Sequence, residues 1–230
     1  LAIATRSATA RPTISPNVTL PAGTEEVPGA GVTLSTLALG YSDATDNQSG
    51  ASNATTAVSG GNTSTAFSYL AIIGSTSYTA AQGAWQVSDG SGGWITIPTT
   101  GLSATNALVF SSSRDIRFVP ANNFFGTPGT LRVVAADGSS TVSTSTSASD
   151  TKSLSANGGT TVTGAWSDTT APRTIGTTVA NVNDRPTASN TSLTATLEDA
   201  ANPSGATVAG LGFGYSDVTD NQGTGGANIT

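Results

Sequence analysis

The sequence of 230 residues contains no cysteine, no histidine and no methionine. Without thiolate or imidazole ligands, the chain cannot build the usual protein sites for zinc, iron or copper. It also has no cysteine nucleophile and no histidine base for a Ser/His/Asp triad. Binding of hard cations stays open, because carboxylates, side-chain amides and backbone carbonyls supply oxygen ligands.

Positive charge is scarce as well. Lys152 is the only lysine, charged residues make up 10% of the chain, and the formal net charge is −6. Nucleic-acid binding needs clustered lysine and arginine side chains to replace phosphate counterions, so we expect no nucleic-acid partner. No apolar run reaches the length of a membrane-spanning helix, so we expect no membrane span.

Small polar residues dominate what is present. Serine and threonine together make 70 of the 230 residues, and glycine adds 27. This composition favours a β-rich, secreted chain. No disulfide can form, so extracellular stability must come from core burial, bound ions or partners. The opening "LAIATRSATARP" has neither an initiator Met nor the order of a signal peptide, and we expect the chain to be part of a longer polypeptide.

An internal repeat organises the chain. The segment "GYSDATDNQ" at 40–48 returns as "GYSDVTDNQ" at 214–222, with one change in nine residues and an offset of 174. At the same offset "RPT" at 11–13 returns at 185–187. With a one-residue slip between these markers, the acidic pair Glu25-Glu26 lies opposite Glu198-Asp199. Self-similarity at a fixed spacing indicates tandem modules.

The repeat predicts three parts. Residues 1–10 align with 175–184, so we interpret them as the last strand of a preceding repeat. Residues 11–184 form one full repeat, and residues 185–230 begin the next. A simple immunoglobulin-like domain has about 100 residues. The full repeat is therefore a β-sandwich with insertions or a pair of smaller domains.

Local patterns predict an all-β fold. Runs of apolar and β-branched residues alternate with clusters of Gly, Asn, Asp, Ser and Pro, and no convincing helix is present. The predicted strands are 31–39, 66–73, 83–88, 93–97, 107–111, 115–120, 130–136 and 174–182. Their large apolar side chains predict a core of Trp85, Trp94, Phe110, Ile116, Phe118, Val119, Phe124, Phe125, Leu131 and Val133. Residues 141–161 are nearly all small and polar, which is typical of a long loop or a weakly packed edge.

Four segments together resemble a known family. They are the early acidic pair, the "YSD" segment followed by further acid, "RFVPANNFFGTPGTLRVVAADG" at 117–138, and "VANVNDRP" at 179–186. Their order is similar to that of the tandem repeats of giant bacterial surface adhesins, described as cadherin-like, VCBS-type or RTX-associated. The resemblance covers nearly the whole chain, although the glycine-rich nonapeptide array of RTX calcium rolls is absent.

The resemblance implies tandem immunoglobulin/cadherin-like β-sandwich modules, stiffened by calcium at or near their junctions, at the bacterial cell surface. Calcium takes six to eight oxygen ligands and tolerates varied geometry. For the second junction the candidate ligands are Asn183, Asp184, Glu198, Asp199, Asp217, Asp220 and Asn221. The corresponding candidates of the full repeat are Glu25, Glu26, Asp43, Asp46 and Asn47. The first junction, residues 7–12, has lost its acid, so no junction calcium is expected there.

Simpler interpretations of these residues stay open. Aspartate and asparagine in a glycine-bounded loop often form Asx-turns without an ion. Glu198-Asp199 also fits a solvated strand end. Tyr41 and Tyr215 fit core or rim aromatics, and core packing explains Trp85 and Trp94 better than stacking on a sugar.

Two functions follow from this pattern, and neither is enzymatic. A pair of catalytic carboxylates must face each other across a cleft, whereas these acids lie in short loops that recur with the repeat. We expect a structural or adhesive repeat of a large secreted surface protein, with neighbouring repeats and possible surface glycans as partners. The alternative is a self-assembling subunit of an extracellular filament, sheath or surface layer, in which identical subunits pair through exposed strands.

Overall fold

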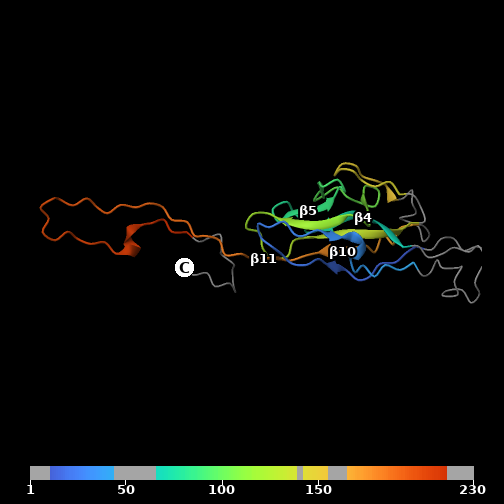
Figure 1. Ribbon diagram of the computed structural model, residues 1–230, viewed down its shortest axis with the longest axis horizontal. Coiled ribbons are helices and arrows are strands. Elements are labelled where there is room, and N and C mark those ends of the chain that lie inside the picture. The colour runs from blue at the N-terminus through green and yellow to red at the C-terminus, as the bar shows by residue number, and fades with distance from the viewer. Residues whose placement is uncertain (1–10, 44–65, 139–141, 155–164, 217–230) are drawn as a thin grey trace, which may run out of the picture. The chain divides into compact units, whose positions relative to one another are not determined.

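The computed structural model describes residues 11–43, 66–138, 142–154 and 165–216 (Figure 1). The contacts divide the chain into two units, Leu1–Ala180 and Asn181–Thr230. We call them unit 1 and unit 2, and each is described by itself.

Unit 1 is built mainly from strands, and the short 3-10 helix η1 is among its described elements. The elements in chain order are β1 Val18–Thr19, β2 Gly23–Thr24, β3 Val32–Thr33, η1 Leu34–Thr36, β4 Phe67–Thr76, β5 Gly83–Ser88, β6 Trp94–Thr96, β7 Leu108–Ser111, β8 Asp115–Pro120, β9 Thr130–Asp137, β10 Arg173–Gly176 and β11 Val179–Ala180. The predicted all-β class is confirmed. Two of the predicted strands differ from the structure. The segment 31–39 has only two strand residues, β3, before the helix η1, and the segment 174–182 is divided into β10 and β11.

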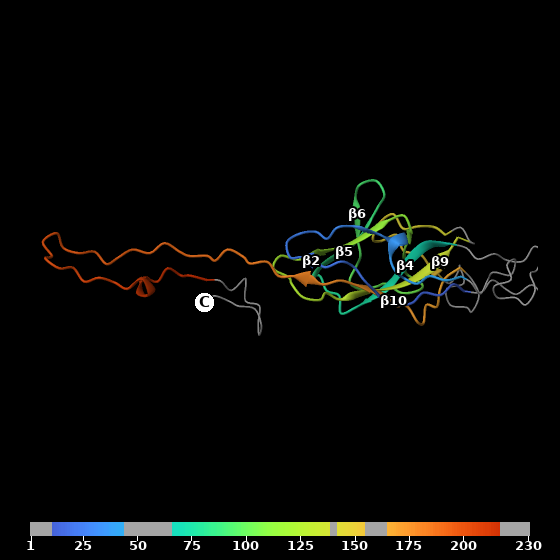
Figure 2. The same cartoon turned by 60° about the horizontal axis from the view of Figure 1, so that its bottom comes forward.

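The strands form two main sheets and one small one (Figure 2). The five-stranded sheet has the order β1-β10-β9-β4-β7, and the four-stranded sheet has the order β3-β8-β5-β6. A pair of short strands, β11 and β2, makes the third sheet. The first strand, β1, runs parallel to β10, whereas the remaining pairs of the two main sheets are antiparallel.

The main core joins the inner faces of the two large sheets. Side chains of the five-stranded sheet, such as Leu70, Phe110 and Val133, share one buried cluster with Trp85 and Ile116 of the four-stranded sheet. Along β8, buried and half-buried residues alternate, as predicted for a strand with one buried face. The predicted core is confirmed for Trp85, Phe110, Ile116, Phe118, Leu131 and Val133. Trp94, Val119, Phe124 and Phe125 are only half-buried.

A second core lies on the other face of the five-stranded sheet. Ala71, Val109 and Val134 of this face pack with residues from two later segments, including Leu154 and Trp166. For this reason β9 is buried on both faces from Val133 onward, although its sequence begins with an alternating pattern. The described part of 141–161, residues 142–154, is a loop, which is one of the two predicted alternatives, and Val142, Ser145 and Leu154 of this loop are buried. Residues 141 and 155–161 lie outside the described residues.

Unit 2 forms a long open loop with one 3-10 helix, η4 Val208–Leu211, among its described residues. The backbone groups of Thr187 and Ser216 bond to each other at 2.8 and 2.9 Å. Almost all of its described side chains are exposed or half-buried.

Candidate functional site

The first predicted acidic loop, residues 43–47, begins directly after a backbone contact between Ser42 and Thr13. The N–H of Thr13 donates to the carbonyl of Ser42 at 2.7 Å, and the N–H of Ser42 donates back at 2.9 Å. These bonds hold Asp43 beside Thr13, and the Asp43 side chain is buried, with 5% of the residue exposed. Asp46 and Asn47 of the same loop lie outside the described residues.

Gly40 makes this closure possible. It has a φ of 53°, a left-handed conformation that glycine adopts without strain. A Cβ atom at this position would lie 1.8 Å from the carbonyl oxygen of Ser15. The glycine of "GYSD" therefore permits a close backbone approach that brings the acidic loop against the start of the module.

The acidic pair Glu25-Glu26 lies elsewhere in unit 1. The N–H of Glu25 donates to the carbonyl of Ala180 at 3.0 Å, next to β2 and β11. Glu25 is buried and Glu26 is exposed, with a φ of 63°. These two residues were expected to share one ligand set with Asp43.

Hydrogen bonds at and near these acidic residues show where Asp43 and Glu25 lie in unit 1. Ile14, next to Thr13, accepts a bond from Arg173 at 2.9 Å, whereas Glu25 bonds to Ala180. The strands β1 and β2 run parallel to β10 and β11, so the chain advances along them from Thr13 to Glu25. The structure therefore does not bring Glu25 and Asp43 together.

Unit 2 contains a backbone contact like the one between Thr13 and Ser42. Asn183 and Asp184 lie just before the bond between Thr187 and Ser216, and Asp217 directly follows it in the sequence. Asp217, Asp220 and Asn221 lie outside the described residues.

Glu198 and Asp199 are exposed and lie farther along the open loop. They are separated from Asp184 by the bonds from Ser189 to Phe213 and from Thr191 to Leu211. Among the described ligands of the second junction, the structure does not gather Asn183 and Asp184 into one set with Glu198 and Asp199.

The described residues contain no group of three or more carboxylates that could hold a metal ion. Calcium needs six to eight oxygen atoms, so the described acids alone do not make a site. The loops 43–47 and 217–221 each contain two aspartates and one asparagine, and most of these residues lie outside the described part. Calcium binding there stays a prediction.

Other aspartates, which the sequence interpretation did not single out, cap turns. Asp89 accepts hydrogen bonds from the N–H groups of Ser91 and Gly93, and these bonds lower the pKa of its carboxyl. Asp168 accepts from the N–H and hydroxyl of Thr170, which likewise lower its pKa. A Ser or Thr two residues after Asp was the available signal, since Asx-turns have this spacing.

The two tryptophans near the 88–93 turn differ in environment. Trp85 is fully buried, as expected for core packing. Trp94 is half-buried at the edge strand β6, and the guanidinium carbon of Arg117 lies 3.8 Å from the centre of a Trp94 ring. This contact occupies a ring face that a sugar would use for stacking.

Unit 1 also contains an apolar hollow of about 250 Å³. Its walls include Leu20, Val27, Pro28, Phe118 and Val179, and no ionisable side chain lines it. The hollow therefore offers neither a general acid nor a general base.

In the described part of the chain, none of the helices has the length and apolar character needed to cross a bilayer. Comparison of the chain with protein-family models, with curated proteins and with solved structures gives no match.

Proposed function

We propose that the chain is a stretch of tandem β-sandwich modules from a large, secreted bacterial cell-surface protein, in which the modules act as structural spacers or adhesive repeats. The observation that carries this proposal is the recurrence of one contact set at an offset of 174 residues. The bond between Thr13 and Ser42 in unit 1 has its counterpart between Thr187 and Ser216 in unit 2.

The recurrence extends beyond this pair. The bond from Ser15 to Leu39 has its counterpart from Ser189 to Phe213. The helices η1 and η4 start at equivalent positions, Leu34 and Val208. Gly40 and Gly214 have φ angles of 53° and 54°. Such agreement supports the interpretation that both segments open a module of the same kind.

The strand order supports the immunoglobulin/cadherin-like part of the proposal. In the seven-stranded immunoglobulin sandwich, strands B, E and D share one sheet and strands C, F and G share the other. Taken in chain order, β3, β4, β5, β8, β9 and β10 correspond to B, C, D, E, F and G, and they give the same two sheets. The additional strands β6 and β7 lie between D and E, which accounts for part of the extra length of the repeat.

Exposed apolar side chains in unit 2 support a modular role as well. Leu193, Val208 and Phe213 are 68%, 72% and 39% exposed. Their counterparts in unit 1, Leu20, Leu34 and Leu39, are at most 5% exposed and belong to the main core. A body like residues 66–180 would bury the unit 2 side chains in the same way.

The proposed role is mechanical and not catalytic. It includes calcium in the loops 43–47 and 217–221 as a stiffening ion, and neighbouring modules as partners. The lining of the apolar hollow and the separation of Glu25 from Asp43 favour this role over hydrolysis, which needs a pair of facing carboxylates.

A graft tests the proposal. Thr230 is equivalent to Thr56, so residues 57–184 fused after Thr230 would complete a second module in register. We expect a second cooperative unfolding transition and hydrogen-exchange protection of residues 208–213. A Phe213→Asp change should abolish that transition and leave the first one in place. A graft of the same length with scrambled sequence is the control. The proposal fails if the in-register graft leaves residues 208–213 as unprotected as the scrambled one.

A further inference from the structure

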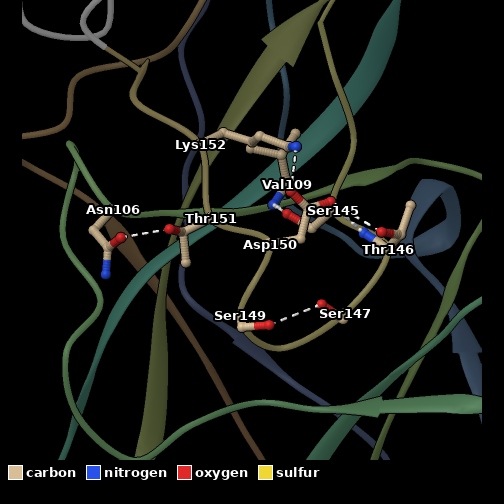
Figure 3. A network of polar contacts seen from close by, with 9 residues as sticks. All are labelled: Asn106, Val109, Ser145, Thr146, Ser147, Ser149, Asp150, Thr151 and Lys152. Carbon is tan, nitrogen blue, oxygen red and sulfur yellow. Dashed lines mark hydrogen bonds and ion pairs between the residues drawn. The ribbon is translucent and has the colours of Figure 1, made fainter.

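Residues 142–154, which we call the strap, lie along the outer edge of β7 (Figure 3). Ser145 donates its N–H to the carbonyl of Val109 at 2.7 Å, and its hydroxyl oxygen accepts from the N–H of Val109 at 3.0 Å. Ala107 and Lys152 exchange two backbone bonds, at 2.8 and 2.7 Å. The strap thus occupies the backbone groups that β7 turns away from β4.

Without the strap, β7 would be an exposed edge with two apolar faces. It is the last strand of the five-stranded sheet. Leu108 and Phe110 belong to the main core, whereas Ala107 and Val109 belong to the second core. An open edge of this kind is a template for pairing with another chain.

The strap covers the neighbouring face as well as the edge. Val142 and Leu154 pack in the second core against the five-stranded sheet. Between these two anchors the strap is made of serine and threonine with one alanine, one aspartate and one lysine. Its composition therefore suits a segment that closes a sheet edge and gives that edge no new apolar surface.

Local bonds hold the strap in shape. Asp150 accepts from the N–H and hydroxyl of Thr146 and from the amino group of Lys152. Thr151 donates its hydroxyl to Asn106 at the start of the β7 segment. These side chains are exposed or half-buried, and surface bonds of this type contribute little each. A segment held in this way opens more readily than the strands beneath it.

We propose that the strap guards a strand-pairing edge, and that when it leaves, β7 pairs antiparallel with β7 of a second copy of this chain. Pairing of identical strands across a two-fold axis lets each copy satisfy the same backbone groups of the other. The strand suits this partner because its outward N–H groups, at Ala107 and Val109, recur with the two-residue period of a β ladder. The inference goes beyond the module proposal and does not depend on it.

The test removes the strap from the edge by proline substitution. In the full chain, Ser145→Pro with Lys152→Pro deletes two N–H donors to β7 and the serine hydroxyl that accepts from Val109. The matched control is Ala148→Pro, in the exposed turn that the bond from Asp150 to Ser147 closes. Proline is favoured at this second turn position. We expect the double variant to double its sedimenting mass as concentration rises, while the wild type and the control stay monomeric.

Hydrogen exchange then locates the contact. In the dimer, the amides of Ala107 and Val109 should stay protected although the strap bonds are gone. A folded double variant that remains monomeric, or a dimer in which these amides exchange freely, overturns the proposal.

If the double variant does not fold, the wild type decides the question. Urea below the main transition should raise the exchange of the Ala107 and Val109 amides at low concentration, and this opening should be accompanied by dimers at high concentration. Opening without dimers, or exchange only through global unfolding, overturns the proposal.

Discussion

The indole Nε1 of Trp85 donates a hydrogen bond of 2.9 Å to the carbonyl oxygen of Gly129. Trp85 belongs to β5 of the four-stranded sheet, and Gly129 directly precedes β9 of the five-stranded sheet. The bond is buried, so it fixes one sheet against the other across the main core. A Cβ at Gly129 would lie 2.1 Å from the backbone nitrogen of Tyr78, which is why the turn needs glycine there.

We expect Trp85→Phe to reduce the free energy of unfolding by about 2–4 kcal/mol, because it leaves a cavity and a buried carbonyl without its donor. Urea unfolding followed by far-UV circular dichroism measures the change. Trp94→Phe is the matched control, since Trp94 is half-buried and its contact with Arg117 is worth about 0.5–1 kcal/mol. Equal losses in the two variants would contradict the role assigned to the bond.

The two equivalent glycines give a paired prediction. Gly40→Ala should destabilise unit 1 by about 1–3 kcal/mol, because the left-handed φ is strained for alanine and the new methyl group meets the Ser15 carbonyl. Gly214→Ala meets only the side-chain oxygen of Ser189, at 2.5 Å, and lies in unit 2. It should leave the main thermal transition unchanged in calorimetry. A similar fall in melting temperature for both variants would contradict this assignment.

The third prediction concerns the effect of calcium bound in the loop 43–47. If this loop binds the ion, calcium at a hundredfold excess over the dissociation constant should stabilise the chain by about 2.7 kcal/mol relative to a chelator. Asp46→Asn should remove most of this gain, because it takes a carboxylate from the ligand set. Glu26→Gln should keep it, since Glu26 adjoins β2 and not this loop.

The absence of a calcium effect would point to a different explanation of the loop 43–47. A melting temperature that does not respond to calcium, in the wild type and in Asp46→Asn alike, would leave an Asx-turn as the explanation of the loop.

The sequence predicted the strands well because their apolar patterns are local. The strand 115–120 alternates in the sequence and in the structure, since one of its faces meets the core. The burial of both faces of β9 was not predictable in the same way, because its outer face is covered by residues such as Leu154 and Trp166, which are distant in the chain. Small polar residues in the strap concealed its packing role.

The separation of the candidate calcium ligands Glu25 and Asp43 was not predictable from the sequence either. Glu25 and Asp43 are close in the sequence, and both align with acidic residues of the next repeat. Their separation depends on the direction of β1 and β2, which run parallel to β10 and β11 and carry Glu25 away from Thr13. That pairing involves residues more than 150 positions apart, so the repeat pattern alone could not reveal it.

Acid should loosen the strap through Asp150. Its pKa lies below the ordinary value of 3.8, first because Lys152 donates a hydrogen bond to the carboxylate and then because Thr146 does. A depressed pKa in the folded state means that the stabilisation is present above the unfolded pKa and is lost as the pH falls through the folded pKa. The relevant window therefore lies below about pH 4.

Asp150→Asn isolates this contribution, because the amide keeps the shape of the side chain and cannot titrate in this window. We expect the variant to show faster opening of the strap already at neutral pH, with a smaller further change on acidification than the wild type. Amide exchange of Ala107 and Val109, corrected for the intrinsic pH dependence, measures the opening. Asp89→Asn is the matched control, because Asp89 also has a lowered pKa but caps the turn before β6, away from the strap. If Asp89→Asn and Asp150→Asn change the exchange of these amides equally, the pH effect does not act through the strap.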